Sequence, residues 1–135
     1  MSLLKYFYLY LLTFPVFLLI DFVWLGLIAK KFYRNNLGHL LLDKFNLFPA
    51  MIFYLLFTLG IIVFAVMPGV EKTSVVRALV LGAFLGLVAY ATYDLSNLAT
   101  LKNWPLIIVF VDIIWGTVLG GTVATISYFI SRLFI

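Results

Sequence analysis

The sequence predicts an all-α integral membrane protein, a single domain in which four transmembrane helices form an up-down-up-down bundle. Four long apolar segments carry this prediction, at about 6–29, 48–67, 76–98 and 105–130. Each reaches the roughly 20 residues that a helix needs to cross about 30 Å of hydrocarbon. The composition agrees, because 66% of the 135 residues are hydrophobic and only 10% are charged, whereas soluble domains carry about 25% charged residues.

The first span, 6–29, contains a single charged residue, Asp21. It is too long for the core of a signal peptide and lacks a small-x-small cleavage site, so it is kept as a helix. The connection 30–47 is the longest and most polar of the chain. The second span, 48–67, has no charged residue, and Met67-Pro68-Gly69 is expected to end it because proline and glycine interrupt helices.

Spans three and four are expected to form a tight antiparallel hairpin. Ser74 is the predicted N-cap of the third span. After the short connection, Asn103-Trp104-Pro105 is typical of a helix cap, an interfacial tryptophan and an early-helix proline. Four spans place both termini on one side of the membrane. Five basic residues on the opposite side against four on that of the termini favour external termini by a narrow margin.

Three of the five acidic residues lie inside the predicted spans: Asp21, Asp94 and Asp112. Each opposes insertion near a helix centre by about 2.5–3.5 kcal/mol, so three in one small protein call for a reason. Counting along the helices places them about 6 to 9 Å from the span centres, all toward the side of the first and third connections. No lysine or arginine lies near these acids within the spans, since Arg77 is at the opposite end of the third span. The acids therefore either hold protons at neutral pH or face a hydrated cavity that admits cations.

Small residues recur every four positions along spans three and four and lead into two of these acids. The two stripes are Gly82, Gly86, Tyr90 and Asp94, and Asp112, Gly116, Gly120 and Ala124. Such stripes let membrane helices approach closely, and this packing role is sufficient to explain the glycines. We therefore expect Asp94 and Asp112 to face the bundle interior as neighbours across the hairpin.

The candidate binding or proton-relay residues are the three aspartates and the polar and aromatic residues near them. They are Asp21, Asp94, Asp112, Asn97, Tyr90, Tyr93, Trp24 and Trp115, with Thr100, Ser96, Tyr33, Arg34 and His39 as a secondary set. Each of the two tryptophans follows an aspartate by three residues. Because their spans run in opposite directions, this doublet indicates local convergence rather than an internal duplication. His39, in a polar connection, is also typical of a surface residue.

Composition excludes several kinds of site and partner. The chain has no cysteine, which excludes disulfides, thiol catalysis and thiolate metal ligands. A single histidine cannot build a multi-histidine metal site, and we expect neither a metal nor a cofactor. The formal net charge of +4 is too small and too scattered for a nucleic-acid-binding surface.

Several segments together are similar to a known family. They are Asp21-Phe22-Val23-Trp24-Leu25-Gly26, Phe32-Tyr33-Arg34, Leu37-Gly38-His39, residues 90–101 with Tyr93-Asp94-Leu95-Ser96-Asn97 at their centre, Trp104-Pro105, and Asp112-Ile113-Ile114-Trp115-Gly116-Thr117. In these segments the chain resembles the uncharacterised bacterial membrane protein family catalogued as domain of unknown function 2177. The resemblance implies a four-span, multi-pass protein of the bacterial inner (cytoplasmic) membrane and brings no assigned activity.

The acids at a common level favour proton-linked binding or transport of a small or lipophilic solute, because such groups build proton relays in membranes. The partners expected are membrane lipids, a lipophilic small molecule and a second copy of the chain in a homodimer.

Two alternatives remain open. A membrane-embedded acid/base enzyme acting on a lipid, sterol or isoprenoid would use paired acids in an apolar pocket. A non-catalytic scaffold or accessory subunit would use them only for helix packing. A water-filled cavity open to one side would favour transport, and a closed apolar pocket with a lateral opening to lipid would favour an enzyme. Direct Asp–Asn or Asp–Tyr pairs with no cavity would favour a scaffold.

Overall fold

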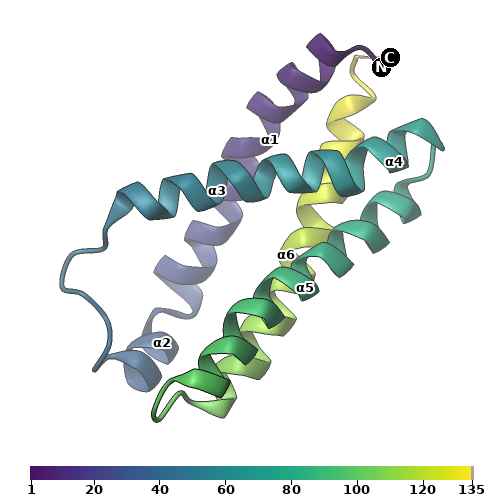
Figure 1. The fold of residues 1–135 in the computed structure, drawn as a ribbon. Coiled ribbons are helices and arrows are strands. Elements are labelled where there is room, and N and C mark those ends of the chain that lie inside the picture. Colours follow the sequence, from purple (N-terminus) through teal and green to yellow (C-terminus); the bar gives the residue numbers. More distant parts are fainter. Residues whose placement is uncertain (135) are drawn as a thin grey trace.

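The computed structural model describes residues 1–134, and over that range the chain is helical with no strand. Four helical segments are long and apolar enough to cross a membrane: Leu3–Ile28, Leu47–Glu71, Val75–Thr100 and Leu106–Ser131. The predicted fold class, a four-helix membrane bundle, is confirmed. The two ends of the chain lie together (Figure 1), and Lys5 Nζ donates to the carbonyl oxygen of Phe134 at 2.9 Å.

Helices α5 (Val75–Thr100) and α6 (Leu106–Ser131) form the expected hairpin, which is the most extensive helix contact in the molecule. Their glycine stripes face each other so closely that the two backbones touch. A Cβ built on Gly86 would lie 1.9 Å from the carbonyl oxygen of Gly116, and one on Gly120 would lie 2.2 Å from that of Gly82. Only glycine permits this close approach of the two helices, which fixes the register of α5 against α6.

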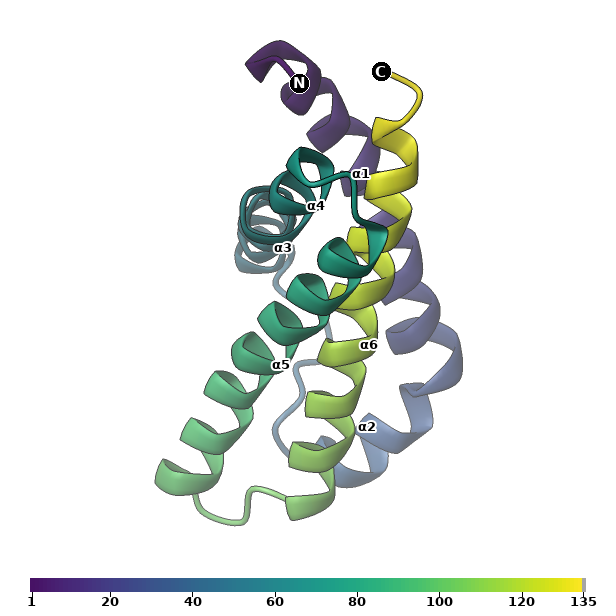
Figure 2. The ribbon, with the colours of Figure 1, turned by 90° about the vertical axis from the view of Figure 1, so that its right-hand side faces the viewer.

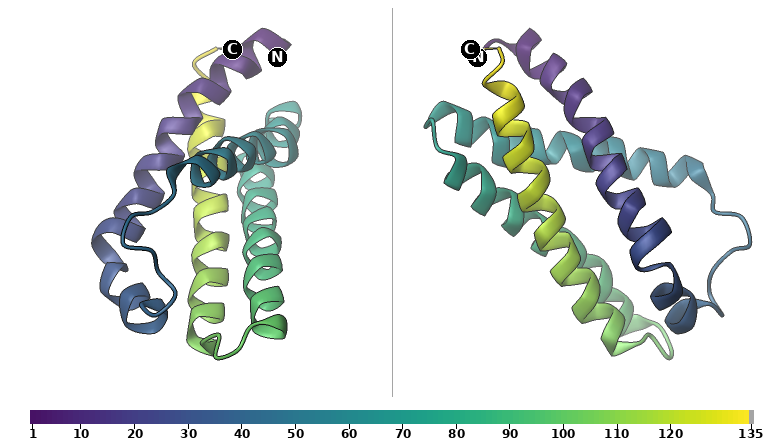
Figure 3. Two further views of the ribbon diagram at one scale, coloured as in Figure 1. Left: turned by 60° about the vertical axis from the view of Figure 1, so that its left-hand side comes forward. Right: turned by 180° about the vertical axis from the view of Figure 1, so that it is seen from behind.

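Helix α1 (Leu3–Val23) runs antiparallel to α6 (Figures 1 and 3) and is extended by a π-helical turn, η1 (Trp24–Ile28). Inside the bundle, the hydroxyl groups of Thr13 and Ser127 share a buried hydrogen bond of 2.7 Å. This bond ties the middle of α1 to α6. Asp21 lies two turns further along α1, in the half that leads to η1.

The second span is one continuous segment made of α3 (Leu47–Ile61), the π-helical turn η2 (Ile62–Val66) and α4 (Met67–Glu71). It crosses the other three spans obliquely (Figures 1 and 3). The contact with α1 is made by bulky rings, because Phe17 packs against Tyr54 and Phe57 at centroid distances of 5.5 and 5.6 Å. Bulky rings therefore fill this crossing, whereas glycines line the contact between α5 and α6.

The predicted end of this span at Met67-Pro68-Gly69 is wrong, because α4 continues to Glu71. The π-helical turn η2 ends at Val66, two residues before Pro68, so the residues that precede this proline depart from regular α-helical hydrogen bonding. Gly69 is required here by packing. Its Cβ would lie 2.7 Å from that of Ala78 in α5.

The connection 30–47 is not simply a loop, since it begins with the helix α2 (Lys30–Leu37). This helix lies at the end of the bundle near the α5–α6 turn (Figure 2). Its apolar side chains pack on the start of α6 in a cluster of Leu37, Trp104, Ile108 and Val109, with Phe32 and Tyr33 beside them. The eight residues of α2 are mixed in polarity and give only a weak helical pattern in the sequence. Packing against α6 stabilises this short helix.

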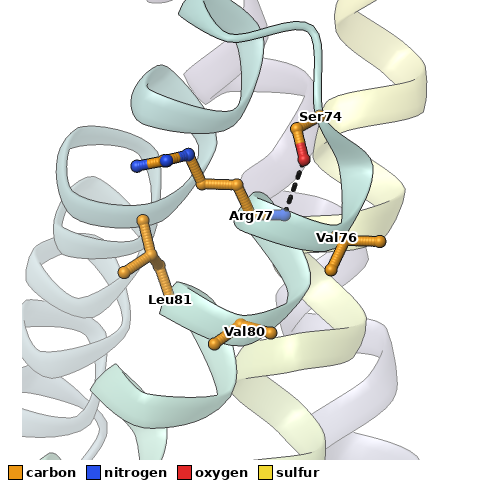
Figure 4. A pocket seen from close by; sticks show the side chains of 5 residues that line it. All are labelled: Ser74, Val76, Arg77, Val80 and Leu81. Carbon is orange, nitrogen blue, oxygen red and sulfur yellow. Dashed lines mark hydrogen bonds between the residues drawn. The ribbon is translucent and has the colours of Figure 1, made fainter.

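The two predicted caps of the hairpin have different outcomes. Ser74 is the N-cap of α5, as expected, and its hydroxyl accepts from the backbone N–H of Arg77 at 3.1 Å (Figure 4). Asn103 is not a cap. It has a left-handed φ of 59° in the turn, and Pro105 occupies the N-cap position of α6 without a side-chain bond. The chain reverses within a few residues here, and asparagine tolerates the conformation that this turn requires.

Candidate functional site

Three carboxyl groups, those of Asp21, Asp94 and Asp112, are buried in the bundle and form what we call the carboxyl cluster. Their side chains are 4%, 0% and 7% exposed, respectively. They come from α1, α5 and α6, in the half of the bundle near α2 and the α5–α6 turn. The groups that surround them are phenols and indoles rather than cations.

Asp112 is held by a chain of neutral donors that starts in η1. The indole N–H of Trp24 donates to the hydroxyl oxygen of Tyr33 at 3.2 Å, and this hydroxyl donates to Asp112 Oδ1. Burial, together with the bond to Asp112, raises the pKa of the Tyr33 phenol well above its ordinary value. Tyr33 therefore remains a neutral donor at physiological pH, and it ties α2 to the carboxyl cluster.

Asp21, on α1, in turn accepts a hydrogen bond from a tryptophan of α6. The indole N–H of Trp115 donates to Asp21 Oδ1 at 3.1 Å, and the hydroxyl of Tyr54 lies beside the same carboxyl group. The rings of Trp24 and Trp115 stack with their centroids 4.5 Å apart and their planes within 10°. Since α1 and α6 are antiparallel, the two Asp-x-x-Trp segments serve each other: each tryptophan leads to the aspartate of the other helix.

Asp94 differs from the other two acids. Its carboxyl group lies against Asp112 and near the indole nitrogen of Trp104. Neither of its oxygens meets a donor in hydrogen-bonding geometry, and neither does Trp104 Nε1 meet an acceptor. A fully buried carboxyl group that lacks a donor is costly, so its position beside a second carboxyl group is a candidate for ligand or proton binding.

Two tyrosines of α5 separate this cluster from an apolar pocket. The ring of Tyr90 packs against Gly116, and its hydroxyl is within electrostatic reach of Asp21 and Asp112. Tyr93 is 55% exposed and contacts Trp104 edge-on at 5.9 Å. The pocket, of about 460 Å³, lies between α3 and α5. Its lining, which defines the aromatic pocket, is Phe53, Ala89, Tyr90 and Tyr93.

Several residues of the predicted site lie elsewhere. Ser96 and Thr100 are exposed, and the Thr100 hydroxyl donates to the Ser96 carbonyl of its own helix at 2.8 Å. Asn97 is half-buried beside Tyr93 rather than bonded to Asp94. Arg34 and His39 are exposed. Around a helix, residues two and six positions from Asp94 point away from it, which explains the outward direction of Ser96 and Thr100.

Two residues near the acids were not predicted there. Tyr54 is the one tyrosine of the second span, and this was a usable signal for an inward-facing hydroxyl. Trp104 was expected at the interface with lipid headgroups but is only 8% exposed, because α2 covers it. Without knowledge of α2, its place beside Asp94 could not be inferred.

A second, open pocket of about 390 Å³ lies at the opposite end of α5, and Figure 4 shows the side chains of Ser74, Val76, Arg77, Val80 and Leu81 that line it. It has no contact with the carboxyl cluster. Among residues 1–134, no group of three or more histidine or acidic side chains is placed to hold a metal ion.

A family model described as a predicted membrane protein (DUF2177) matches residues 6–129. The chain belongs to this family. The match spans all three aspartates, and the resemblance noted in the sequence is confirmed. No curated protein and no solved structure matches the chain. Because the family description names a membrane protein and no activity, function has to be argued from the carboxyl cluster and the aromatic pocket.

Proposed function

We propose that this protein resides in the bacterial cytoplasmic membrane and binds or transports a lipophilic solute in a proton-linked manner, with Asp94 and Asp112 as the proton-binding pair. The observation that carries the proposal is Asp94, a fully buried carboxyl group with no hydrogen-bond donor that lies against a second carboxyl group. Two adjacent carboxylates repel each other strongly at low dielectric, and one shared proton relieves this repulsion. A solute that brings its own donor to Asp94 would take over the role of that proton.

The aromatic pocket supports a lipophilic solute. Phe53 and Tyr93 are half-exposed on the outer surface of the bundle, where lipid would surround a membrane protein. A solute could therefore enter from the bilayer, and Tyr90 would separate it from the acids. This route differs from an aqueous channel, in which polar side chains line the path.

The same pocket favours a second candidate, an acid/base enzyme acting on a lipid, sterol or isoprenoid. Paired carboxyl groups next to an apolar pocket can donate and accept protons on a hydrocarbon skeleton. Turnover of a lipid added to the purified protein would distinguish this activity from binding. The Asp112–Tyr33 pair also fits a packing role, which the following experiment tests directly. The homodimer expected from the sequence remains a prediction.

The test compares Asp94→Asn with Asp43→Asn, an exposed acid in the connection after α2 that serves as a matched control. The three tryptophans of the chain all lie beside the carboxyl cluster, so intrinsic fluorescence reports on its protonation. In lipid nanodiscs, the fluorescence of the parent and of Asp43→Asn should change with pH. That of Asp94→Asn should change less, because the Asp94–Asp112 pair is lost while Asp21 and Asp112 can still bind protons beside Trp115 and Tyr33. Its thermal stability should remain close to that of the parent.

The second measurement is mass spectrometry of the lipophilic molecules that copurify with each protein. A molecule retained by the parent and by Asp43→Asn but lost from Asp94→Asn would support solute binding. A parental pH response and the same copurified molecules in Asp94→Asn would show that Asp94 has only a packing role.

A further inference from the structure

The carboxyl cluster and the aromatic pocket together indicate a chemical class of solute. We infer that the solute is a lipophilic amine whose apolar part occupies the aromatic pocket and whose ammonium group binds Asp94 and Asp112. This inference rests on the proposed function and adds the charge and the donor chemistry of the solute. Three features carry it: the charge balance of the cluster, the unpaired oxygens of Asp94, and the lining of the pocket.

The charge balance favours a cation. The donors to the cluster, Trp115 and Tyr33, are neutral, and so is Trp24, which donates to the Tyr33 hydroxyl. The predicted spans contain no lysine or arginine at the level of the acids. Buried carboxylates without a counter-charge are expensive, and a bound cation compensates them where a neutral solute cannot. A carboxylic acid of the same shape would add to the repulsion.

The unpaired oxygens favour a cation with N–H donors. Both oxygens of Asp94 are buried and lack a donor, and Asp112 lies directly beside them. An ammonium group presents up to three N–H donors and no acceptor. One such group can bond to both carboxylates at once, which a hydroxyl with its single hydrogen cannot.

The pocket fits the apolar part of such a molecule. Its volume of about 460 Å³ lies within the range of roughly 300–1,000 Å³ typical of small-molecule sites. Three of the four lining residues are aromatic, and aromatic rings also attract ammonium groups. Tyr90 lies one helical turn before Asp94 on the same face of α5, so the pocket and the acids adjoin along one helix. An amine would pass the Tyr90 and Tyr93 side chains to reach Asp94.

The experiment uses 4-phenylbutylamine and its neutral analogue 4-phenylbutanol, added to the full-length protein in phosphatidylcholine nanodiscs. Tryptophan fluorescence reports binding, and empty nanodiscs correct for partition into lipid. We expect the amine to give a saturable change with an affinity at least about tenfold higher than that of the alcohol, equivalent to about 1.4 kcal/mol. Equal responses to the two probes would overturn the inference, and this comparison needs no variant.

A pair of variants tests the location. Ala89→Phe fills the pocket, whereas Val88→Phe adds the same ring one residue away on the exposed side of α5. Ala89→Phe should weaken amine binding about tenfold and Val88→Phe should leave it unchanged; equal affinities would refute the pocket as the site. If the amine fails to bind while Asp94→Asn still reduces the pH response, the amine class is wrong and the proton-binding pair stands. Loss of that pH difference would instead refute the proposed function.

Discussion

A methyl group added to Gly86 would collide with the backbone of α6, and this offers a sharp test of the α5–α6 packing. Its Cβ would lie 1.9 Å from the carbonyl oxygen of Gly116 and 2.7 Å from its carbonyl carbon. Both are backbone atoms, which cannot rotate away as a side chain can. Restoring ordinary contact requires the helices to separate by about 1.5 Å, and we expect Gly86→Ala to lower the free energy of unfolding by about 3 kcal/mol.

The control is Gly60→Ala in α3, where the new Cβ would meet only Leu85 Cδ2 at 3.8 Å. Because alanine favours helix over glycine by up to about 1 kcal/mol, this variant should be as stable as the parent or slightly more stable. Titration with sodium dodecyl sulfate in mixed micelles, followed by circular dichroism, measures both. Equal stability of Gly86→Ala and Gly60→Ala would refute the close approach of α5 and α6. The separation should also move Asp94 from Asp112 and weaken the pH response of the fluorescence.

Two further predictions concern residues around the cluster. Tyr33→Phe removes the donor to the buried Asp112 carboxyl group and should lower the free energy of unfolding by about 1.5–3 kcal/mol. Tyr8→Phe, at an exposed position in α1, should not, and the same detergent titration would contradict the Tyr33 bond if both variants matched the parent. Arg34→Ala and His39→Ala change exposed side chains and should leave the fluorescence response to pH unaltered. A lost response in either would place that residue in the site.

The sequence was sufficient for the four apolar helices and for the placement of the three acids in the same half of the bundle. Both depend on local patterns, because a long apolar run predicts a span and the helical rise converts residue counts into position along each helix. The same holds for the facing of α5 and α6. Glycines at every fourth position mark a close contact, and Asp94 and Asp112 continue those stripes.

The partners of the acids depended on the tertiary structure. Tyr33 reaches Asp112 because α2 packs against the start of α6. The α2 segment is too short and too mixed in polarity to be predicted as a helix from the sequence. The crossing of α3 decides that Tyr54 lies beside Asp21 and that an apolar pocket adjoins Tyr90. Helical periodicity determines which residues of one helix share a face. The rotation and crossing of each helix against its neighbours arise only from the packing of side chains that are distant in sequence.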